Sequence, residues 1–64
     1  MLYNVYVIGK HDEWLALSTE SKDKAIERAR FEDMTNKRDG GKDLSVEIRF
    51  NEDDETGSCE VLEF

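Results

Sequence analysis

Four stretches of the chain, rich in β-branched and aromatic residues or alternating between apolar and polar positions, predict four β-strands. They cover residues 2–8, 13–18, 44–50 and 58–64. The first stretch is apolar on both of its faces, so we expect it to be a central strand that is at least partly covered on each side. Glycine-containing segments separate the stretches, and one of these, residues 9–12, is expected to form the loop of a hairpin.

The alternation also assigns side chains to the two faces of each strand. The third strand is the most regular, since one of its faces is wholly apolar and consists of Leu44, Val46, Ile48 and Phe50. In the second strand, the spacing predicts that Leu15 and Leu17 share one face and that Trp14 and Ala16 share the other. These faces predict a sheet with one side on a core and one side in water.

Residues 22–35 have the composition of a helix. Ser21 is the expected N-cap, because its hydroxyl can accept a hydrogen bond from a free N–H of the first turn. At about 100° per residue, Ala25, Ile26 and Ala29 fall on one face, which we expect to pack on the sheet. Residues 36–43, with two adjacent glycines, are expected to end the helix and turn the chain.

The predicted order of elements is β-β-α-β-β. Two hairpins joined by one helix indicate an α+β fold: a single two-layer domain over residues 1–64, with one helix packed on one face of an antiparallel sheet. The order of the strands within the sheet is not determined by this pattern.

Phe31 and Met34 fall on the side of the predicted helix roughly opposite the alanine face. Two structural explanations are open: the helix ends near Arg30 and the chain curls inward, or the sheet wraps far enough to cover both side chains. The third explanation is that the pair is exposed and forms part of a surface for a partner or for self-association.

The charge of the chain is strongly asymmetric. The 64 residues include 38% hydrophobic and 39% charged residues, with a net charge of −7. Residues 51–64 hold six of the sixteen acids and no base, and four of these acids are consecutive, at positions 52–55. A negative field of this kind repels phosphate backbones and anionic lipids, so we expect no direct binding to nucleic acid or membrane.

The acidic run predicts a small, non-enzymatic interaction module, an inhibitor or an adaptor, that docks on a basic surface of another protein. The expected partner-binding residues are Glu52, Asp53, Asp54, Glu55, Phe31 and Met34. Two alternatives are an acidic mimic of nucleic acid and a homodimer formed through the apolar last strand. A fourth explanation is that the run is only a solvated turn that maintains solubility.

Few residues could support catalysis or bind a metal. His11 lies in the predicted hairpin loop without a legible catalytic partner, and the single cysteine, Cys59, is expected to be a small apolar residue of the last strand. Asn51, Asp53 and Glu55 alternate as calcium ligands do, but the sixth position of such a loop is Thr56 and the twelfth is Leu62. We therefore expect no enzyme activity, no cofactor and no dedicated metal site.

The order of elements, with Ser18-Thr19 closing a strand before a helix that carries Ala25-x-x-x-Ala29, is similar to that of small phage-encoded inhibitors of bacterial enzymes. The resemblance covers roughly residues 2–30 and implies a protein that works by binding another protein. The free cysteine and the lack of a basic-then-apolar leader predict a cytoplasmic location.

Overall fold

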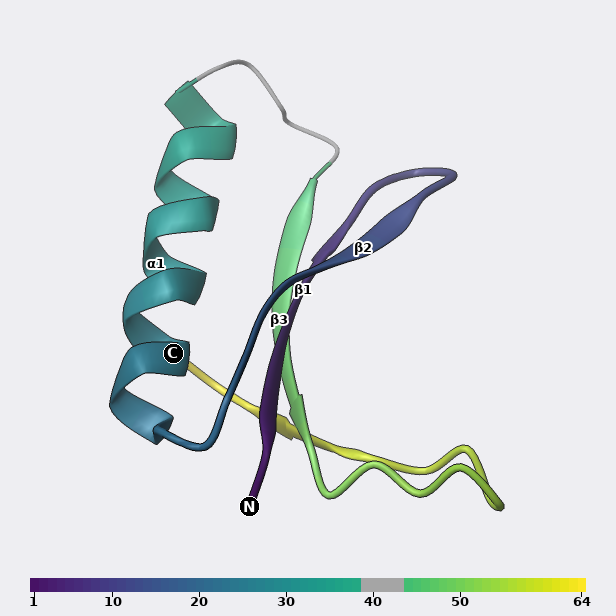
Figure 1. Ribbon diagram of the computed structural model, residues 1–64. Coiled ribbons are helices and arrows are strands. Elements are labelled where there is room, and N and C mark those ends of the chain that lie inside the picture. Colours follow the sequence, from purple (N-terminus) through teal and green to yellow (C-terminus); the bar gives the residue numbers. More distant parts are fainter. Residues whose placement is uncertain (39–43) are drawn as a thin grey trace.

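The computed structural model describes residues 1–38 and 44–64. Its elements follow the order β1 (Tyr3–Ile8), β2 (Glu13–Thr19), α1 (Lys22–Arg38), β3 (Ser45–Phe50) and β4 (Glu60–Leu62). The four strands form one antiparallel sheet in the order β2-β1-β3-β4, and α1 packs against one face of it (Figure 1). The predicted α+β architecture is therefore confirmed, with β1 and β3 as the central strands.

The helix begins where the sequence predicts. The backbone N–H of Lys24 donates to the Ser21 hydroxyl at 3.3 Å, and the N–H of Ala25 donates to the Ser21 carbonyl at 3.0 Å. Ser21 is thus the N-cap, and it satisfies donors that have no partner within the helix. The helix continues through Arg38, beyond the predicted end near Thr35 but within the segment 36–43 that was expected to end it. The predicted double-glycine turn falls at Gly40 and Gly41, outside the described residues.

A small core joins the helix to the two central strands. Val5, Ala25, Ala29 and Ile48 are fully buried and form one cluster, with larger side chains such as Leu17 packed around it. The two alanines face the sheet, as predicted, and their small side chains allow the helix to lie close to β1 and β3. A domain of this size has few fully buried residues, because much of its surface remains in water.

The faces of β2 differ from the prediction. Leu17 pairs with Val5, but Leu15 pairs with Tyr6, so the register shifts and Ala16 is an extra residue in the strand. This β-bulge places Leu17 on the helix side and Leu15 on the uncovered side. The expectation that both leucines share a face was wrong, because one inserted residue reverses the alternation that follows it.

The last strand is shorter than predicted. Only Glu60–Leu62 pair with β3, where Leu62 is opposite Ile48 and Val61 is opposite Arg49. Cys59 lies before the strand and is exposed, so it is not the packed apolar residue that we expected.

Candidate functional site

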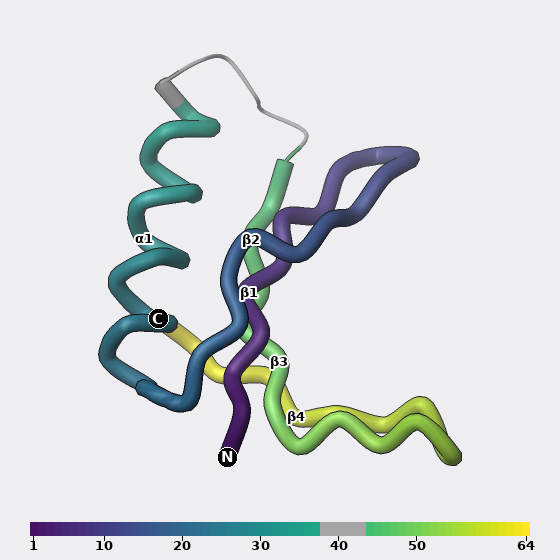
Figure 2. The backbone as a smooth tube through the Cα atoms, in the orientation of Figure 1, coloured from purple at the N-terminus to yellow at the C-terminus, as the bar shows by residue number. Residues whose placement is uncertain are grey.

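Residues 51–59 form an extended connection between β3 and β4, which we call the acidic arm. It projects away from the sheet on the side opposite the helix (Figure 2). The tip is closed by two backbone hydrogen bonds: Asp53 N–H donates to the Ser58 carbonyl at 2.8 Å, and Gly57 N–H donates to the Asp53 carbonyl at 2.8 Å. Gly57 has φ +70°, a conformation that glycine adopts without strain. The arm therefore has a defined turn.

Side chains fix the tip as well. The carboxylate Oδ1 of Asp53 accepts a hydrogen bond from the Glu55 N–H at 2.9 Å, as in an Asx turn. The Thr56 and Ser58 hydroxyls are 2.7 Å apart, and Thr56 Oγ1 also accepts from the Ser58 N–H at 3.3 Å. These contacts use one carboxylate of the acidic run and leave those of Asp54 and Glu55 in water.

The base of the arm is attached to the sheet by amide side chains. Asn4 Nδ2 donates to Glu52 Oε1 at 2.9 Å, and the side-chain oxygen Oδ1 of Asn4 accepts from the Ser18 hydroxyl at 2.7 Å. Across the arm, Asn51 Nδ2 donates to Glu60 Oε2 at 2.6 Å. Asn51 has φ +53°, a left-handed conformation that asparagine tolerates better than most residues. The direction of the arm is thus set by hydrogen bonds at its base.

The carboxylates of the arm form no ion pair with a described residue, although Arg49 lines the same shallow hollow as Glu52, Asp53 and Asp54. All residues from 51 to 59 are exposed, and no ion pair between described residues involves them. Other acids do have partners: Glu32 pairs with Arg28 at 2.8 Å, and Asp33 pairs with Lys37 at 3.2 Å. No ion pair between described residues therefore compensates the carboxylates of the arm.

Phe31 and Met34 lie on the surface of α1, with 53% and 61% of their areas exposed. Both structural explanations that would bury them are excluded, because the helix runs on to Arg38 and the sheet does not cover them. Phe31 borders a shallow pocket together with Leu17 of β2 and the helix residues Lys24, Glu27 and Arg28. The Arg28 guanidinium carbon is 5.8 Å from the centre of the Phe31 ring.

The two predicted groups of partner-binding residues do not form one surface. Glu52 contacts Asn4 on the uncovered face of the sheet, whereas Phe31 and Met34 belong to the helix on the other face (Figure 1). A partner bound to the acidic arm would have to extend around the edge of the sheet to contact the helix as well. We therefore treat the acidic arm as the candidate site and the exposed helix residues as a separate surface.

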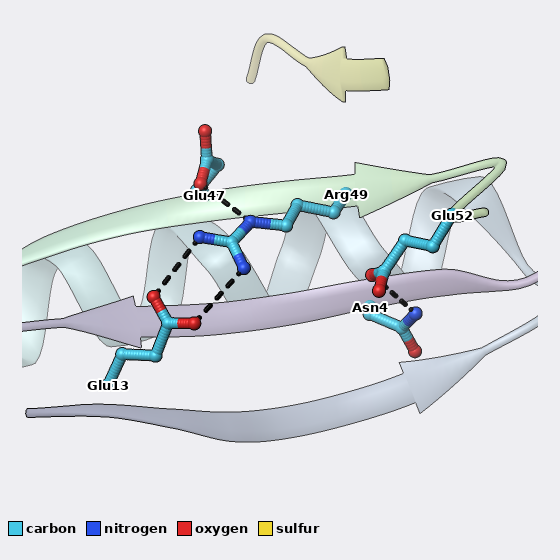
Figure 3. A network of polar contacts seen from close by, with 5 residues as sticks. All are labelled: Asn4, Glu13, Glu47, Arg49 and Glu52. Carbon is cyan, nitrogen blue, oxygen red and sulfur yellow. Dashed lines mark hydrogen bonds and ion pairs between the residues drawn. The ribbon is translucent and has the colours of Figure 1, made fainter. Parts of the chain in front are cut away.

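A polar network on the uncovered face was not predicted. The Arg49 guanidinium donates two 3.2 Å hydrogen bonds to the two carboxylate oxygens of Glu13 and one of 2.8 Å to Glu47 (Figure 3). Its central carbon lies 4.4 Å from the centre of the Tyr6 ring, within range of a cation–π interaction. These groups come from β1, β2 and β3, so only the order of the strands could have revealed that they meet.

The network changes the ionisation of its members. The hydrogen bonds and the charge of Arg49 hold the pKa of the Glu13 carboxyl below its ordinary value. The bond with Glu13 also raises the pKa of Arg49. Partial burial, followed by the negative charge of Glu52, raises the pKa of the Tyr6 phenol. Each shift favours the protonation state present at neutral pH, as expected for a structural network.

The remaining candidates for chemistry are exposed. His11 lies in the loop between β1 and β2, which is closed by a 2.6 Å hydrogen bond from Gly9 N–H to the Asp12 carbonyl. Among the described residues, no three His, Cys, Asp or Glu side chains come together as a metal site would require. In the same part of the chain, no helix has the length and apolar character that crossing a bilayer demands.

No family model, no curated protein and no solved structure matches this chain.

Proposed function

We propose that the protein is a small, non-enzymatic interaction module that binds a partner protein by docking the acidic arm on a basic surface. One observation carries the proposal: four consecutive acids lie on an ordered, projecting turn, and no described residue forms an ion pair with them. The biochemical role that fits this arrangement is that of an inhibitor or an adaptor.

Two physical effects favour docking through the acidic arm. Concentrated negative charge attracts a basic surface over distances near the Debye length, which is about 10 Å at 0.1 M salt, and it raises the rate of association. The hydrogen bonds at the tip and at the base hold the arm in one conformation before any partner arrives. Binding then costs less conformational entropy than it would for a disordered acidic segment.

An acidic mimic of nucleic acid receives less support. Mimicry requires carboxylates spread along a surface at intervals like those of phosphates. Here they are concentrated in one projecting turn, and the acids of the uncovered face, Glu13 and Glu47, are occupied by Arg49. A basic surface that receives a single acidic arm fits this distribution better than a long nucleic-acid cleft does.

The test is capture of partners from a lysate of the source cell by the tagged protein, followed by washing at low and high salt. The informative variant is Asp54→Lys with Glu55→Lys, because substitution of Asp53 would also break its hydrogen bond to the Glu55 N–H. The matched control is Asp12→Lys with Glu20→Lys, which changes the net charge equally at two exposed positions outside the arm. We expect the wild type and the control to retain one dominant protein that high salt releases.

The arm variant should lose that protein, with affinity reduced at least tenfold in a subsequent titration with the purified partner. Retention of the partner by the arm variant would disprove docking through the arm. Equal losses in the arm variant and in the control would show that net charge, and not the arm, governs the interaction.

A further inference from the structure

The outer edge of β2 is the longest strand edge that the described residues leave unpaired. The strand order β2-β1-β3-β4 gives β2 a neighbour on one side only, and the strand is seven residues long. The N–H and C=O groups that point outward from an edge strand can bond to another strand. The other edge strand, β4, has only three residues.

This edge has little protection against pairing. Residues 14–19 carry no charge, although 39% of the whole chain is charged. The one charged residue of the strand, Glu13, is held by two hydrogen bonds from Arg49 of the same chain. Proteins commonly protect edges with lysine, proline or a bulge, and of these β2 has only the bulge at Ala16.

β2 carries two large, half-exposed apolar side chains, Trp14 and Leu15, next to the bulge at Ala16. Trp14 pairs with Val7 and lies on the helix side of the sheet, whereas Leu15 pairs with Tyr6 and lies on the uncovered side. Their exposed fractions are 47% and 50%. A strand added at this edge would bring side chains next to both, so apolar area would be buried on each face of the sheet.

The charge distribution selects the strand that can be added. The acidic arm and β4, with five of the six acids of residues 51–64, belong to the opposite edge of the sheet (Figure 1), and the sixth, Glu63, directly follows β4. Two copies joined through β4 would bring these negative segments together. Two copies joined through β2 keep these negative segments at the far ends of one continuous sheet. The uncharged residues 14–19 of one copy then lie along those of the other.

We propose that a second copy of this chain pairs with β2, strand against antiparallel strand, across a two-fold axis. A strand paired with itself in this way is self-complementary, as a two-fold interface requires. Self-association through the last strand was one of the alternatives that the sequence left open, and the charge of that edge makes β2 the better surface. The inference is independent of docking through the acidic arm, because the two surfaces lie at opposite edges of the sheet.

Sedimentation velocity over a concentration series tests the proposal, with Leu15→Lys as the informative variant. Val61→Lys is the matched control: Val61 is 52% exposed, belongs to the other edge strand and pairs with Arg49 on the same uncovered face as Leu15. Both variants change the net charge equally. We expect a dimer whose fraction rises with concentration, at least tenfold weaker in Leu15→Lys and unchanged in Val61→Lys.

Amide hydrogen exchange provides a second measurement that needs no substitution. In the wild type, amides of residues 13–19 should become more protected as the protein concentration rises, while those of residues 60–62 should not. Added salt should tighten the dimer, because two copies of net charge −7 repel each other. This sign is opposite to that expected for docking of the acidic arm, so the two proposals fail separately.

A wild-type protein that stays monomeric at millimolar concentration would overturn the proposal. So would a dimer that Val61→Lys weakens and Leu15→Lys does not, or rising protection confined to residues 60–62. A third outcome would also overturn it: the wild type is monomeric and captures a different protein, and Leu15→Lys does not capture that protein. This outcome would show that β2 pairs with a strand of another protein and not with a second copy.

Discussion

Arg49 connects three strands through one side chain. It projects from β3, bonds to Glu13 of β2 and to Glu47 of its own strand, and covers the Tyr6 ring of β1. A guanidinium group suits this position because its planar, forked donors match a carboxylate while its face stacks on an aromatic ring. The uncovered face of the sheet is therefore held together by polar contacts, where the other face has a hydrophobic core.

The pairing of Glu13 with Arg49 predicts how stability depends on pH. The pKa of Glu13 is lower in the folded protein than in the unfolded chain, so its contribution is present above the unfolded value and is lost as the pH falls through the folded value. Glu13→Gln should therefore be less stable than the wild type at neutral pH. Urea unfolding between pH 7 and pH 3 should show this difference shrinking toward acid.

The control for this measurement is Glu20→Gln. Glu20 is exposed and makes no ion pair with a described residue, so this substitution should leave the shape of the pH profile unchanged. A difference between wild type and Glu13→Gln that stayed constant from neutral to acid pH would contradict the stabilising role of the ionised pair.

At the scale of elements, α1 has one packed face and one face in water. Ala25 and Ala29 are fully buried against the sheet, while Phe31 and Met34 on the outer side are more than half exposed. The bulge in β2 has a comparable effect, because it divides Leu15 and Leu17 between the two faces of the sheet. In both elements the apolar residues are exposed because regular backbone geometry, the turn of the helix or the bulge in the strand, directs them away from the core.

Substitutions on the two faces of the fold should differ sharply in effect. Phe31→Ser should change the free energy of unfolding by no more than about 1 kcal/mol, since the ring is already largely in water. Ile48→Ala removes a fully buried side chain and should cost about 2–5 kcal/mol. Chemical denaturation of both variants compares them, and a loss for Phe31→Ser as large as that for Ile48→Ala would mean that the helix packs differently.

At the scale of the whole molecule, charge and apolar surface are segregated. The acidic arm and β4 hold the uncompensated charge at one edge of the sheet, and β2 presents uncharged, half-exposed residues at the other edge. The strand order decides this segregation, because it places the second and fourth strands of the sequence farthest apart. The two edges therefore differ in charge and in exposed apolar surface.

Repulsion within the acidic arm should make folding sensitive to salt. Raising the salt concentration to about 1 M shortens the Debye length to about 3 Å, so we expect the wild type to melt a few degrees higher. Asp54→Lys with Glu55→Lys should melt higher than the wild type at low salt and respond less to added salt. Differential scanning calorimetry at low protein concentration measures both effects.

Asp12→Lys with Glu20→Lys changes the net charge equally but lies where acids and bases are nearly balanced, so its effect at low salt should be smaller. If the two double variants behaved alike, the net charge of the chain, and not the crowding of carboxylates in the arm, would account for the salt dependence.

The sequence by itself determined the elements and the layered fold, because these depend on local periodicity and capping. The alternation in β3, the alanine spacing in α1 and the hydroxyl of Ser21 each act within a few residues, and each prediction was confirmed. The helical wheel also indicated that Phe31 and Met34 could be exposed, but this depended on where the helix ends, which the sequence did not decide.

Only the tertiary structure decided which distant residues meet. The network of Arg49, the attachment of Glu52 to Asn4 and the bulge at Ala16 depend on strand order and register, which link positions far apart in the chain. The alternation of apolar and polar residues along a strand is the same whichever strands lie beside it. The sequence pattern therefore does not indicate which strands are adjacent in the sheet. For this reason the sequence located the charge of the acidic arm, whereas the fold decided that it faces away from the helix and from β2.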